Sequence, residues 1–152
     1  MQFVPGIAFG NIHFGMSVQD VQSIMGPDCI METSEEDDLR LNYYDGRLIY
    51  VFYQEYDFDL TGISIQRASV SIEYAGHDLF SMNYGELMEI FLAEGNISDH
   101  AFSYYEDAGE MESVEFESMG ITLYFDVNQN LMEVNIFELV TDEDEDEFWD
   151  ED

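Results

Sequence analysis

Two segments of the chain place apolar residues at helical spacing. The first, FGMSVQDVQSIMGPD, begins at Phe14, and the second, FSMNYGELMEIFLAE, begins at Phe80. The recurring apolar positions are Val18, Val21, Ile24 and Met25 in the first segment, and Tyr84, Leu87, Met88 and Phe91 in the second. Apolar residues three and four positions apart predict a short amphipathic helix in each segment. We expect the helices to end at Gly26-Pro27 and near Gly95.

Both predicted helices have the same start signal. Ser17 is followed three residues later by Asp20, and Asn83 is followed three residues later by Glu86. Ser and Asn are favourable N-cap residues, because their side-chain oxygens accept hydrogen bonds from the first free N–H groups of a helix. An acid three positions on completes a capping box. The pattern therefore predicts that the helices begin immediately after Ser17 and Asn83.

A constant offset of 66 residues relates these segments and the stretches before them, aligning residues 4–30 with residues 70–96. The aligned pairs include Val4 with Val70, Gly10 with Gly76, Phe14 with Phe80, Met16 with Met82, Val21 with Leu87 and Ile24 with Ile90. We interpret this as one structural unit present twice. Residues 1–68 form the first helix-plus-strands repeat, residues 69–140 form the second repeat of the same continuous domain, and residues 141–152 form an acidic tail.

Strand patterns follow each helix. LRLNYYDGRLIYVFY contains the hairpin signal Asp45-Gly46, and GITLYFDVNQNLMEVNIFEL contains a longer turn at residues 127–130. Residues 61–67 and residues 68–74 alternate apolar and polar side chains, as half-buried strands do. We interpret ISDHAFSYYEDAGEMES, residues 97–113, as an insertion before the strands of the second unit.

The alternation predicts which side chains face the helices. The inward positions are Leu39, Leu41, Tyr43, Ile63, Ile65, Val70, Ile72, Met132, Val134 and Ile136. The outward positions are Arg40, Asn42, Tyr44, Ser64, Gln66, Ser69, Ser71, Glu73, Glu133 and Asn135. We therefore expect an α+β fold in which two tandem repeats of a short helix plus antiparallel strands share one sheet, with the helices on one face and a disordered acidic C-terminal tail. The other face would be polar and in contact with water, which suits a binding surface and is equally typical of any one-sided sheet.

Charge narrows the class of partner. The 152 residues include 35 acids, three arginines and no lysine, for a net charge of -32, and nine of the acids lie in residues 142–152. Such a charge repels nucleic acid and anionic membranes and favours a basic protein partner. Halophilic adaptation is the competing explanation, but the chain is rich in Phe, Tyr, Met and Ile rather than in small residues. With 46% hydrophobic residues, the chain can bury a substantial core.

Compartment signals indicate a cytoplasmic protein. Cys29 is the single cysteine, so no intramolecular disulfide can form, which fits a reducing compartment. The N-terminal residues lack the basic region, long apolar run and cleavage site of a signal peptide. No stretch of 18 apolar residues occurs that would predict a membrane span.

One short motif carries a resemblance to a known family. Gly15-Met16-Ser17, Val21 within the helix and the closing Gly26-Pro27, followed by a strand hairpin, resemble the repeat of beta-lactamase inhibitory protein and of the related small lipoprotein of the outer-membrane assembly machinery. The resemblance implies two such units on one sheet and binding through a concave, aromatic-rich sheet face. Cytosolic immunity proteins that neutralise bacterial toxins are similar too, being small, acidic and α+β.

Signals for catalysis are weak. His13, His77 and His100 are far apart in the sequence, and no serine or cysteine has a nucleophile-elbow motif around it. The absence of lysine excludes Schiff-base chemistry and a phosphate-loop lysine. Carboxylates are too numerous for one pair to stand out as a glycosidase-type acid and base. We therefore expect no enzymatic activity and no cofactor.

Signals for a metal site are equally incomplete. Asp142, Asp144 and Asp146 match the first three ligand positions of a calcium loop, but Glu147 replaces the required glycine. The Asp57/Asp59 pair lacks the rest of such a loop, and no cluster of Cys and His suits zinc. We expect no dedicated metal site.

Acids mixed with tyrosines remain as candidates for binding a protein, because carboxylates attract Arg and Lys and tyrosine supplies rigid contact area. The candidate partner-binding residues are Glu35, Glu36, Asp37, Asp38, Asn42, Tyr44, Tyr53, Glu55, Tyr56, Asp57, Asp59, Glu73, Tyr104, Tyr105, Glu106, Asp107, Glu133 and Asn135. The leading hypothesis is a toxin immunity protein that occludes the basic active-site cleft of a cognate toxin domain. A DNA mimic that titrates basic DNA-binding proteins and an acidic chaperone are the alternatives.

Overall fold

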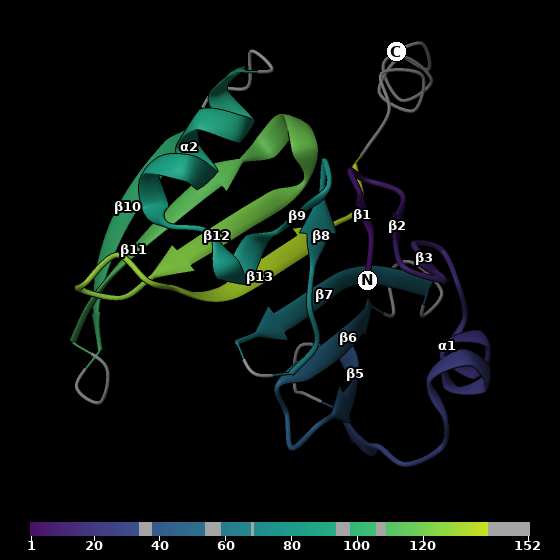
Figure 1. The fold of residues 1–152 in the computed structure, drawn as a ribbon. Helices are drawn as coiled ribbons and strands as arrows, with labels where there is room; N and C mark the ends of the chain where they lie inside the picture. Colours follow the sequence, from purple (N-terminus) through teal and green to yellow (C-terminus); the bar gives the residue numbers. More distant parts are fainter. Residues whose placement is uncertain (34–37, 54–58, 68, 94–97, 106–108, 140–152) are drawn as a thin grey trace, which may run out of the picture.

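The computed structural model describes residues 1–33, 38–53, 59–67, 69–93, 98–105 and 109–139, with residues 102–105 and 109 described by their backbone alone. It is a mixed α+β structure, built mainly from antiparallel strands (Figure 1). The elements of the first half are β1 (Phe3–Val4), β2 (Ala8–Phe9), β3 (Ile12–His13), α1 (Val18–Met25), β4 (Ile30–Thr33), β5 (Asp38–Tyr43), β6 (Leu48–Tyr53) and β7 (Asp59–Gln66). Those of the second half are β8 (Glu73–Tyr74), β9 (His77–Asp78), η2 (Leu79–Ser81), α2 (Tyr84–Ala93), β10 (Asp99–Tyr105), β11 (Gly109–Phe116), η3 (Glu117–Met119), β12 (Ile121–Phe125) and β13 (Leu131–Phe137).

One eight-stranded antiparallel sheet organises the fold, in the order β10-β11-β12-β13-β7-β6-β5-β4. Its two middle strands, β13 and β7, pair from Glu133 opposite Gln66 to Phe137 opposite Gly62. Cross-strand partners share a face of the sheet, so the register defines rows of side chains that run across the strands. Two rows are buried: Tyr43, Leu48, Ile65, Val134, Leu123 and Val114, and Leu41, Tyr50, Ile63, Ile136, Ile121 and Phe116.

Both helices contact this buried face. The Tyr43 hydroxyl donates to the carbonyl of Gly26, the residue that caps α1, at 2.7 Å. On α2, the Tyr84 ring contacts the Phe125 ring with centroids 4.8 Å apart. Figure 1 shows α2 beside β10 to β12 and α1 at the other end of the sheet. The helices therefore cover one face together, as the alternation pattern predicts.

The predicted capping boxes are confirmed. At α1, the Asp20 N–H donates to Ser17 Oγ at 3.1 Å and the Ser17 N–H donates to the Asp20 carboxylate at 3.3 Å. At α2, the Glu86 N–H donates to Asn83 Oδ1 at 2.8 Å and the Asn83 N–H donates to the Glu86 carboxylate at 3.2 Å. Helix α1 ends at Met25, before Gly26, as expected. The end predicted near Gly95 lies outside the described residues.

The segment at residues 97–113 is not an insertion. It supplies strand β10 and the first part of β11, which pair in continuous register from Asp99 opposite Glu115 to Tyr105 opposite Gly109. The prediction was wrong because this segment is rich in acids and tyrosines and lacks clear apolar alternation. An edge hairpin exposes more of its side chains to water, so its sequence signal is weaker than that of a central strand.

The strand expected over residues 68–74 is also not formed. Within the described residues 69–74, only Glu73–Tyr74 is a strand, and it pairs with His77–Asp78 in a small separate hairpin. Ile72 is nevertheless fully buried, because this stretch lies across the core as a connection and not as a sheet strand. Ser69, Ser71 and Glu73 therefore do not belong to the outward sheet face that the sequence predicts.

Two local irregularities change the expected side-chain directions. A bulge in β13 pairs Tyr124 with Glu133 but Phe125 with Leu131, so that Met132 is an extra residue and is 37% exposed. The predicted inward position of Met132 is thus taken by buried Leu131. At the Asp45-Gly46 turn, Tyr43 pairs with Leu48, so the β5–β6 loop has four residues instead of the two of a tight hairpin.

The longer turn predicted before β13 is present and is organised by Asp126. Its carboxylate accepts hydrogen bonds from the backbone N–H groups of Asn128 and Asn130, both at 2.9 Å. These bonds hold the pKa of Asp126 below its usual value, with the Asn130 backbone contributing most. A carboxylate that accepts backbone bonds in this way stabilises the turn.

A glycine fixes the close approach of η3 to the end of β13, and this generates a prediction. Gly120 has φ +67°, and a Cβ built on it would lie 2.5 Å from the Phe137 carbonyl oxygen. Gly15 has φ +91° with no atom within 4 Å of such a Cβ.

We expect Gly15→Ala to lower the free energy of unfolding by about 1–2 kcal/mol, the cost of a left-handed backbone at a non-glycine residue. Gly120→Ala should cost clearly more in the same urea titration, because the backbone must also move; equal losses would contradict the contact.

Candidate functional site

The sheet face opposite the helices, here called the open face, carries three rows of outward side chains. The rows are Gln66, Glu133, Tyr124 and Ser113; Asn42, Ile49, Ser64, Asn135, Thr122 and Glu115; and Arg40, Val51, Gly62 and Phe137. In the middle of this face, over β5, β6, β7 and β13, lies a hollow of about 490 Å³. It is lined by Arg40, Ile49, Val51, Tyr53, Thr61, Gly62, Ser64, Gln66, Glu133, Asn135 and Phe137, with Ile63 and Ile136 contributing from within the sheet.

The floor of the hollow is apolar. Ile49 and Val51 point outward from β6, because they alternate with buried Leu48, Tyr50 and Phe52. Opposite Val51 on β7 stands Gly62, which places no side chain on the floor. A Cβ built there would make only ordinary contacts, 3.7 Å from the Ile136 oxygen and 4.0 Å from Val51 Cβ. Glycine in a strand interior is characteristic of a place where another group comes close to the backbone.

One wall of the hollow carries hydrogen-bond acceptors. Glu133 on β13 lies beside Gln66 on β7. The side-chain amides of Gln66 and of Asn135 each hydrogen-bond to the Glu133 carboxylate. Burial nevertheless raises the pKa of Glu133 above its usual value, since desolvation outweighs those two bonds. The side-chain oxygen of Asn135 is buried and has no hydrogen-bond partner in the described structure.

The opposite wall carries a neutralised ion pair. Arg40 Nε lies 3.2 Å from Asp38 Oδ2, and the Asp38 side chain is 1% exposed against 46% for Arg40. Asp38 is thus the first residue of β5 and is buried, whereas the sequence predicts an exposed loop acid at this position. Tyr53 faces Asp38 on one side and Asp59 on the other, so these three predicted residues meet at one end of the sheet.

The structure brings some of the predicted binding residues together and separates others. Tyr53, Glu133 and Asn135 line the hollow, and Asp38, Asn42 and Asp59 lie on the strands that form it. Asn42 donates to the Ile30 carbonyl at 3.0 Å and so holds the edge strand β4. Tyr44 is in the β5–β6 turn, and Glu73 is in the β8–β9 hairpin away from the open face. The remaining candidates are outside the residues whose side chains are described: Glu35, Glu36, Asp37, Glu55, Tyr56, Asp57, Tyr104, Tyr105, Glu106 and Asp107.

Sequence reasoning missed the apolar floor. Ile49, Val51 and Gly62 are not among the predicted residues, because the prediction rests on acids mixed with tyrosines. A signal was available: LIYVFY, residues 48–53, is apolar at every position. A strand with one face on the core and no polar alternates must present apolar side chains on its other face.

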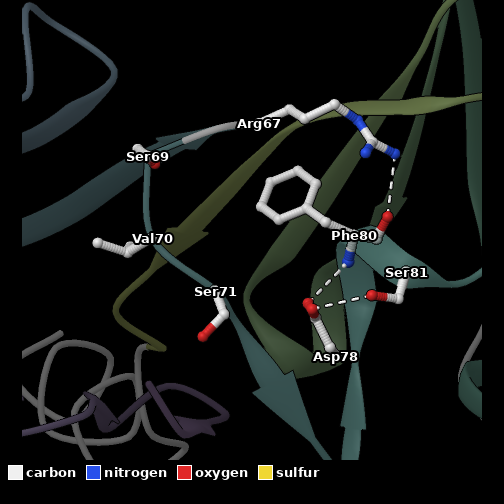
Figure 2. Close-up of a pocket in the computed structure, with 7 residues that line it drawn as sticks. All are labelled: Arg67, Ser69, Val70, Ser71, Asp78, Phe80 and Ser81. Atoms are coloured by element: carbon white, nitrogen blue, oxygen red, sulfur yellow. Dashed lines mark hydrogen bonds between the residues drawn. The ribbon is translucent and has the colours of Figure 1, made fainter.

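A second hollow, of about 570 Å³, lies around the connection from β7 to β8 (Figure 2). Arg67 lines it and donates two hydrogen bonds, from Nε to the Leu131 carbonyl and from Nη2 to the Phe80 carbonyl, both at 2.9 Å. Its guanidinium carbon lies 5.7 Å from the centroid of the Phe80 ring. Asp78 accepts from the Phe80 N–H and from the Ser81 hydroxyl. Both charged groups are engaged in holding the chain, so we assign them a structural role.

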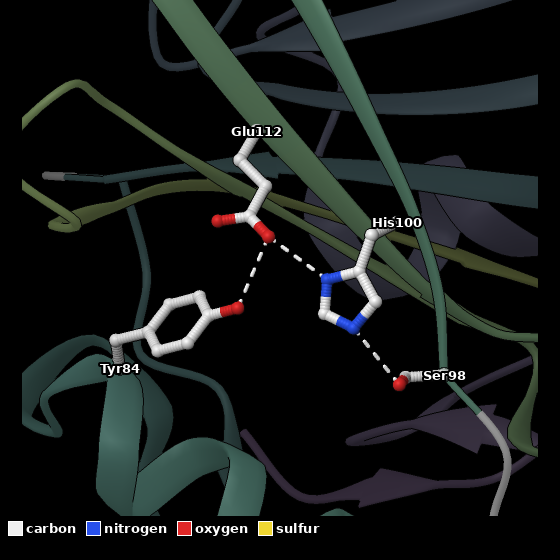
Figure 3. Close-up of polar contacts among 4 residues, drawn as sticks. All are labelled: Tyr84, Ser98, His100 and Glu112. Atoms are coloured by element: carbon white, nitrogen blue, oxygen red, sulfur yellow. Dashed lines mark hydrogen bonds and ion pairs between the residues drawn. The ribbon is translucent and has the colours of Figure 1, made fainter.

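A third polar cluster joins α2 to the edge hairpin (Figure 3). Glu112 accepts from the Tyr84 hydroxyl at 3.0 Å and lies 2.8 Å from His100 Nδ1, while His100 Nε2 lies 2.9 Å from Ser98 Oγ. Burial, followed by the bond to Glu112, raises the pKa of Tyr84. A hydroxyl, an imidazole and a carboxylate in series also occur in serine hydrolases, but catalysis there needs oxyanion donors and a substrate pocket beside the hydroxyl. Ser98 lines neither of the two hollows above, so we interpret the cluster as an anchor for the β10–β11 hairpin.

The described residues contain no group of three or more His, Cys, Asp or Glu side chains arranged to hold a metal ion. None of the helices in the described ranges is long and apolar enough to cross a membrane. Comparison with protein-family models, with curated proteins and with solved structures found no match to this chain. The geometry of the open face is therefore the basis for a functional proposal.

The half-buried carboxylate of Glu133 generates a stability prediction. Burial raises the pKa of Glu133 in the folded state, so the folded protein disfavours the charged carboxylate. The resulting loss of folding stability is fully present above the folded pKa. It disappears below the pKa of the unfolded chain, about 4.3. Glu133→Gln should therefore raise the melting temperature at pH 7 and leave it nearly unchanged at pH 3.5.

Glu115→Gln is the matched control for this change. Glu115 lies on the same face, on β11 and outside the hollow, and its replacement removes the same charge from a protein of net charge -32. Glu133→Gln should stabilise more than Glu115→Gln at pH 7 in a thermal melt followed by circular dichroism. Equal stabilisation by the two variants would mean that general charge repulsion, and not burial, is the cause.

Proposed function

We propose that this chain is a non-catalytic inhibitor, a toxin immunity protein that binds the basic active-site cleft of a cognate enzyme and blocks it sterically and electrostatically. The observation that carries the proposal is the open face: a hollowed sheet surface with an apolar floor and a polar rim on a strongly acidic chain. Protein interfaces combine a dry apolar centre with polar and aromatic surroundings, and opposite charge raises the rate of encounter.

We also propose that the domain consists of two copies of one unit, residues 1–68 and residues 69–140. Supporting this, each half has a small antiparallel sheet, of three strands in the first half and two in the second, then a helix with a capping box, then four strands that are consecutive in the large sheet. The last strands of the two halves, β7 and β13, pair with each other at the centre. In this proposal the acidic tail, residues 141–152, contributes long-range attraction to a basic partner.

The apolar floor favours a dedicated protein partner over the two alternatives. A DNA mimic needs carboxylates spaced like phosphates, and an acidic chaperone needs only a dense negative charge. Neither requires Ile49 and Val51 to be presented on an open sheet face next to a glycine. Buried apolar contacts of this kind retain affinity when salt screens the charges, because the hydrophobic effect does not weaken with salt.

The proposal is tested by capture followed by inhibition. The tagged chain is incubated with lysate of its native host and washed at about 50 mM and then about 300 mM salt, where screening removes contacts that depend on charge alone. We expect one basic enzyme to remain at the higher salt, and the purified chain to abolish its activity at a 1:1 ratio. Retention of many nucleic-acid-binding proteins that all leave at the higher salt, or a captured enzyme that keeps full activity, would overturn the proposal.

Kinetics with the captured partner give a sharper prediction, because Asp59 and Tyr53 are cross-strand neighbours at the rim of the hollow. Asp59→Asn should slow association several-fold at low salt and leave dissociation unchanged, since rim charges act mainly on encounter. Tyr53→Ala should accelerate dissociation roughly thirtyfold, corresponding to ~2 kcal/mol for an aromatic hot spot. Biolayer interferometry at two salt concentrations separates the rates; the same change in both variants would contradict this division of roles.

A further inference from the structure

The hollow of the open face has the chemistry of a site for one particular side chain. Its acceptors and its apolar floor are both present, but the described residues supply no cation to the acceptor wall. We propose that the hollow binds a guanidinium group, the side chain of an arginine on the partner protein, with its charge on Glu133 and its aliphatic stem over Ile49 and Val51. This inference rests on the proposed function and specifies how the partner is held.

Glu133 is a partly desolvated carboxylate at the acceptor wall of the hollow. Its carboxylate is half-buried, and the side-chain amides of Gln66 and Asn135 that hydrogen-bond to it are neutral. Glu133 takes part neither in the ion pair of Arg40 with Asp38 nor in the contact of His100 with Glu112. A partly desolvated carboxylate without a cation is stabilised when one arrives, because its own desolvation cost has already been incurred during folding.

Further hydrogen-bond acceptors surround Glu133. Asn135 contributes a buried side-chain oxygen that lacks a donor, and Thr61, Ser64 and Gln66 line the same hollow with further oxygens. Leaving a buried acceptor unsatisfied destabilises the structure, so a donor that reaches it is favoured. Guanidinium has five N–H donors in a planar fork and no acceptor, whereas an ammonium has three donors around a strongly hydrated point charge. A site rich in oxygen acceptors therefore suits arginine better than lysine.

The apolar floor of the hollow suits the aliphatic part of an arginine side chain. Arginine carries three methylene groups before its charged head, and such stems pack on apolar surface while the head reaches polar partners. Ile49 and Val51 provide that surface, and the missing side chain at Gly62 lets a planar group approach the sheet. The Tyr53 ring, also on the lining, adds a face on which a guanidinium can stack.

Arg40 does not oppose this occupant. It lines the other side of the hollow, but its Nε is held 3.2 Å from the buried Asp38 carboxylate. The pair is locally neutral, so the incoming charge meets the field of Glu133 and of the acids that surround the face. The hollow, at about 490 Å³, also falls within the roughly 300–1,000 Å³ of pockets that hold small groups.

The experiment uses the full chain, labelled with ¹⁵N, and three small probes: N-acetyl-arginine amide, N-acetyl-lysine amide and N-acetyl-citrulline amide. Citrulline has nearly the shape of arginine without its charge. We expect the arginine probe to shift the backbone amides of Gly62, Ser64 and Glu133 in a saturable, millimolar titration. The lysine probe should bind at least threefold more weakly, and the citrulline probe should give no saturable shift.

Variants assign the site. Glu133→Gln should weaken binding of the arginine probe at least tenfold, and Glu115→Gln, which removes an equal charge outside the hollow, should leave it within twofold. Gly62→Val should abolish binding by filling the floor; a Cβ there meets only ordinary contacts, so the amide spectrum should remain that of a folded protein. Shifts scattered over the acidic surface, equal losses in the two glutamate variants, or undiminished binding by folded Gly62→Val would each overturn the inference.

The outcome is separable from that of the proposed function. If the chain inhibits its partner at 1:1 but the arginine probe does not bind in the hollow, the guanidinium site is wrong and the inhibitor proposal stands. If the probe binds but no basic enzyme is captured and inhibited, the site stands as a guanidinium site without that role.

Discussion

The pairing of β7 with β13 is the contact on which the rest of the structure depends. These strands are far apart in the chain, and each is the last of four strands that follow a helix. Their five paired positions make one sheet of two four-stranded parts, and the two buried rows cross this junction without a break. The hollow depends on it as well, since its floor comes from β6 and β7 and its acceptor wall from β13.

The protein folds despite strong repulsion between its negative charges, and two of its three arginines hold parts of the structure together. Arg67 spans the connection between the halves by donating to the Leu131 and Phe80 carbonyls, and Arg40 compensates the buried Asp38. The charge of Arg40 is therefore balanced locally, whereas that of Arg67 helps to lower the pKa of Asp126. The core is correspondingly aromatic, with Phe91 contacting Phe116 and Tyr74, so apolar burial offsets the repulsion that a charge of -32 imposes.

Local signals were readable in the sequence, and long-range ones were not. Ser17 with Asp20 and Asn83 with Glu86 determine the helix starts through bonds three residues apart, so the letters alone were sufficient. The role of residues 97–113 depends on pairing at the sheet edge, where side chains are free to be polar and the apolar pattern fades. The direction of Met132 depends on a bulge opposite Tyr124, which no property of Met132 itself encodes. The candidate site was found in part, through Tyr53, Glu133 and Asn135; its floor was missed because exposed apolar residues only acquire meaning once the face is known to be open.

The strand order has a further consequence for how copies of this protein behave toward each other. An open sheet ends in two edge strands, and in the described part of the chain these are β4 and β10, each paired with a strand on one side. On β4, the side chains of Ile30 and Met31 are 64% and 49% exposed. Exposed apolar side chains on an edge strand favour strand pairing between molecules. The same negative charge that would draw in a basic partner makes two copies repel at these edges. Salt that screens the charge should therefore weaken the repulsion between copies and, in the proposed function, also slow the encounter with a basic partner.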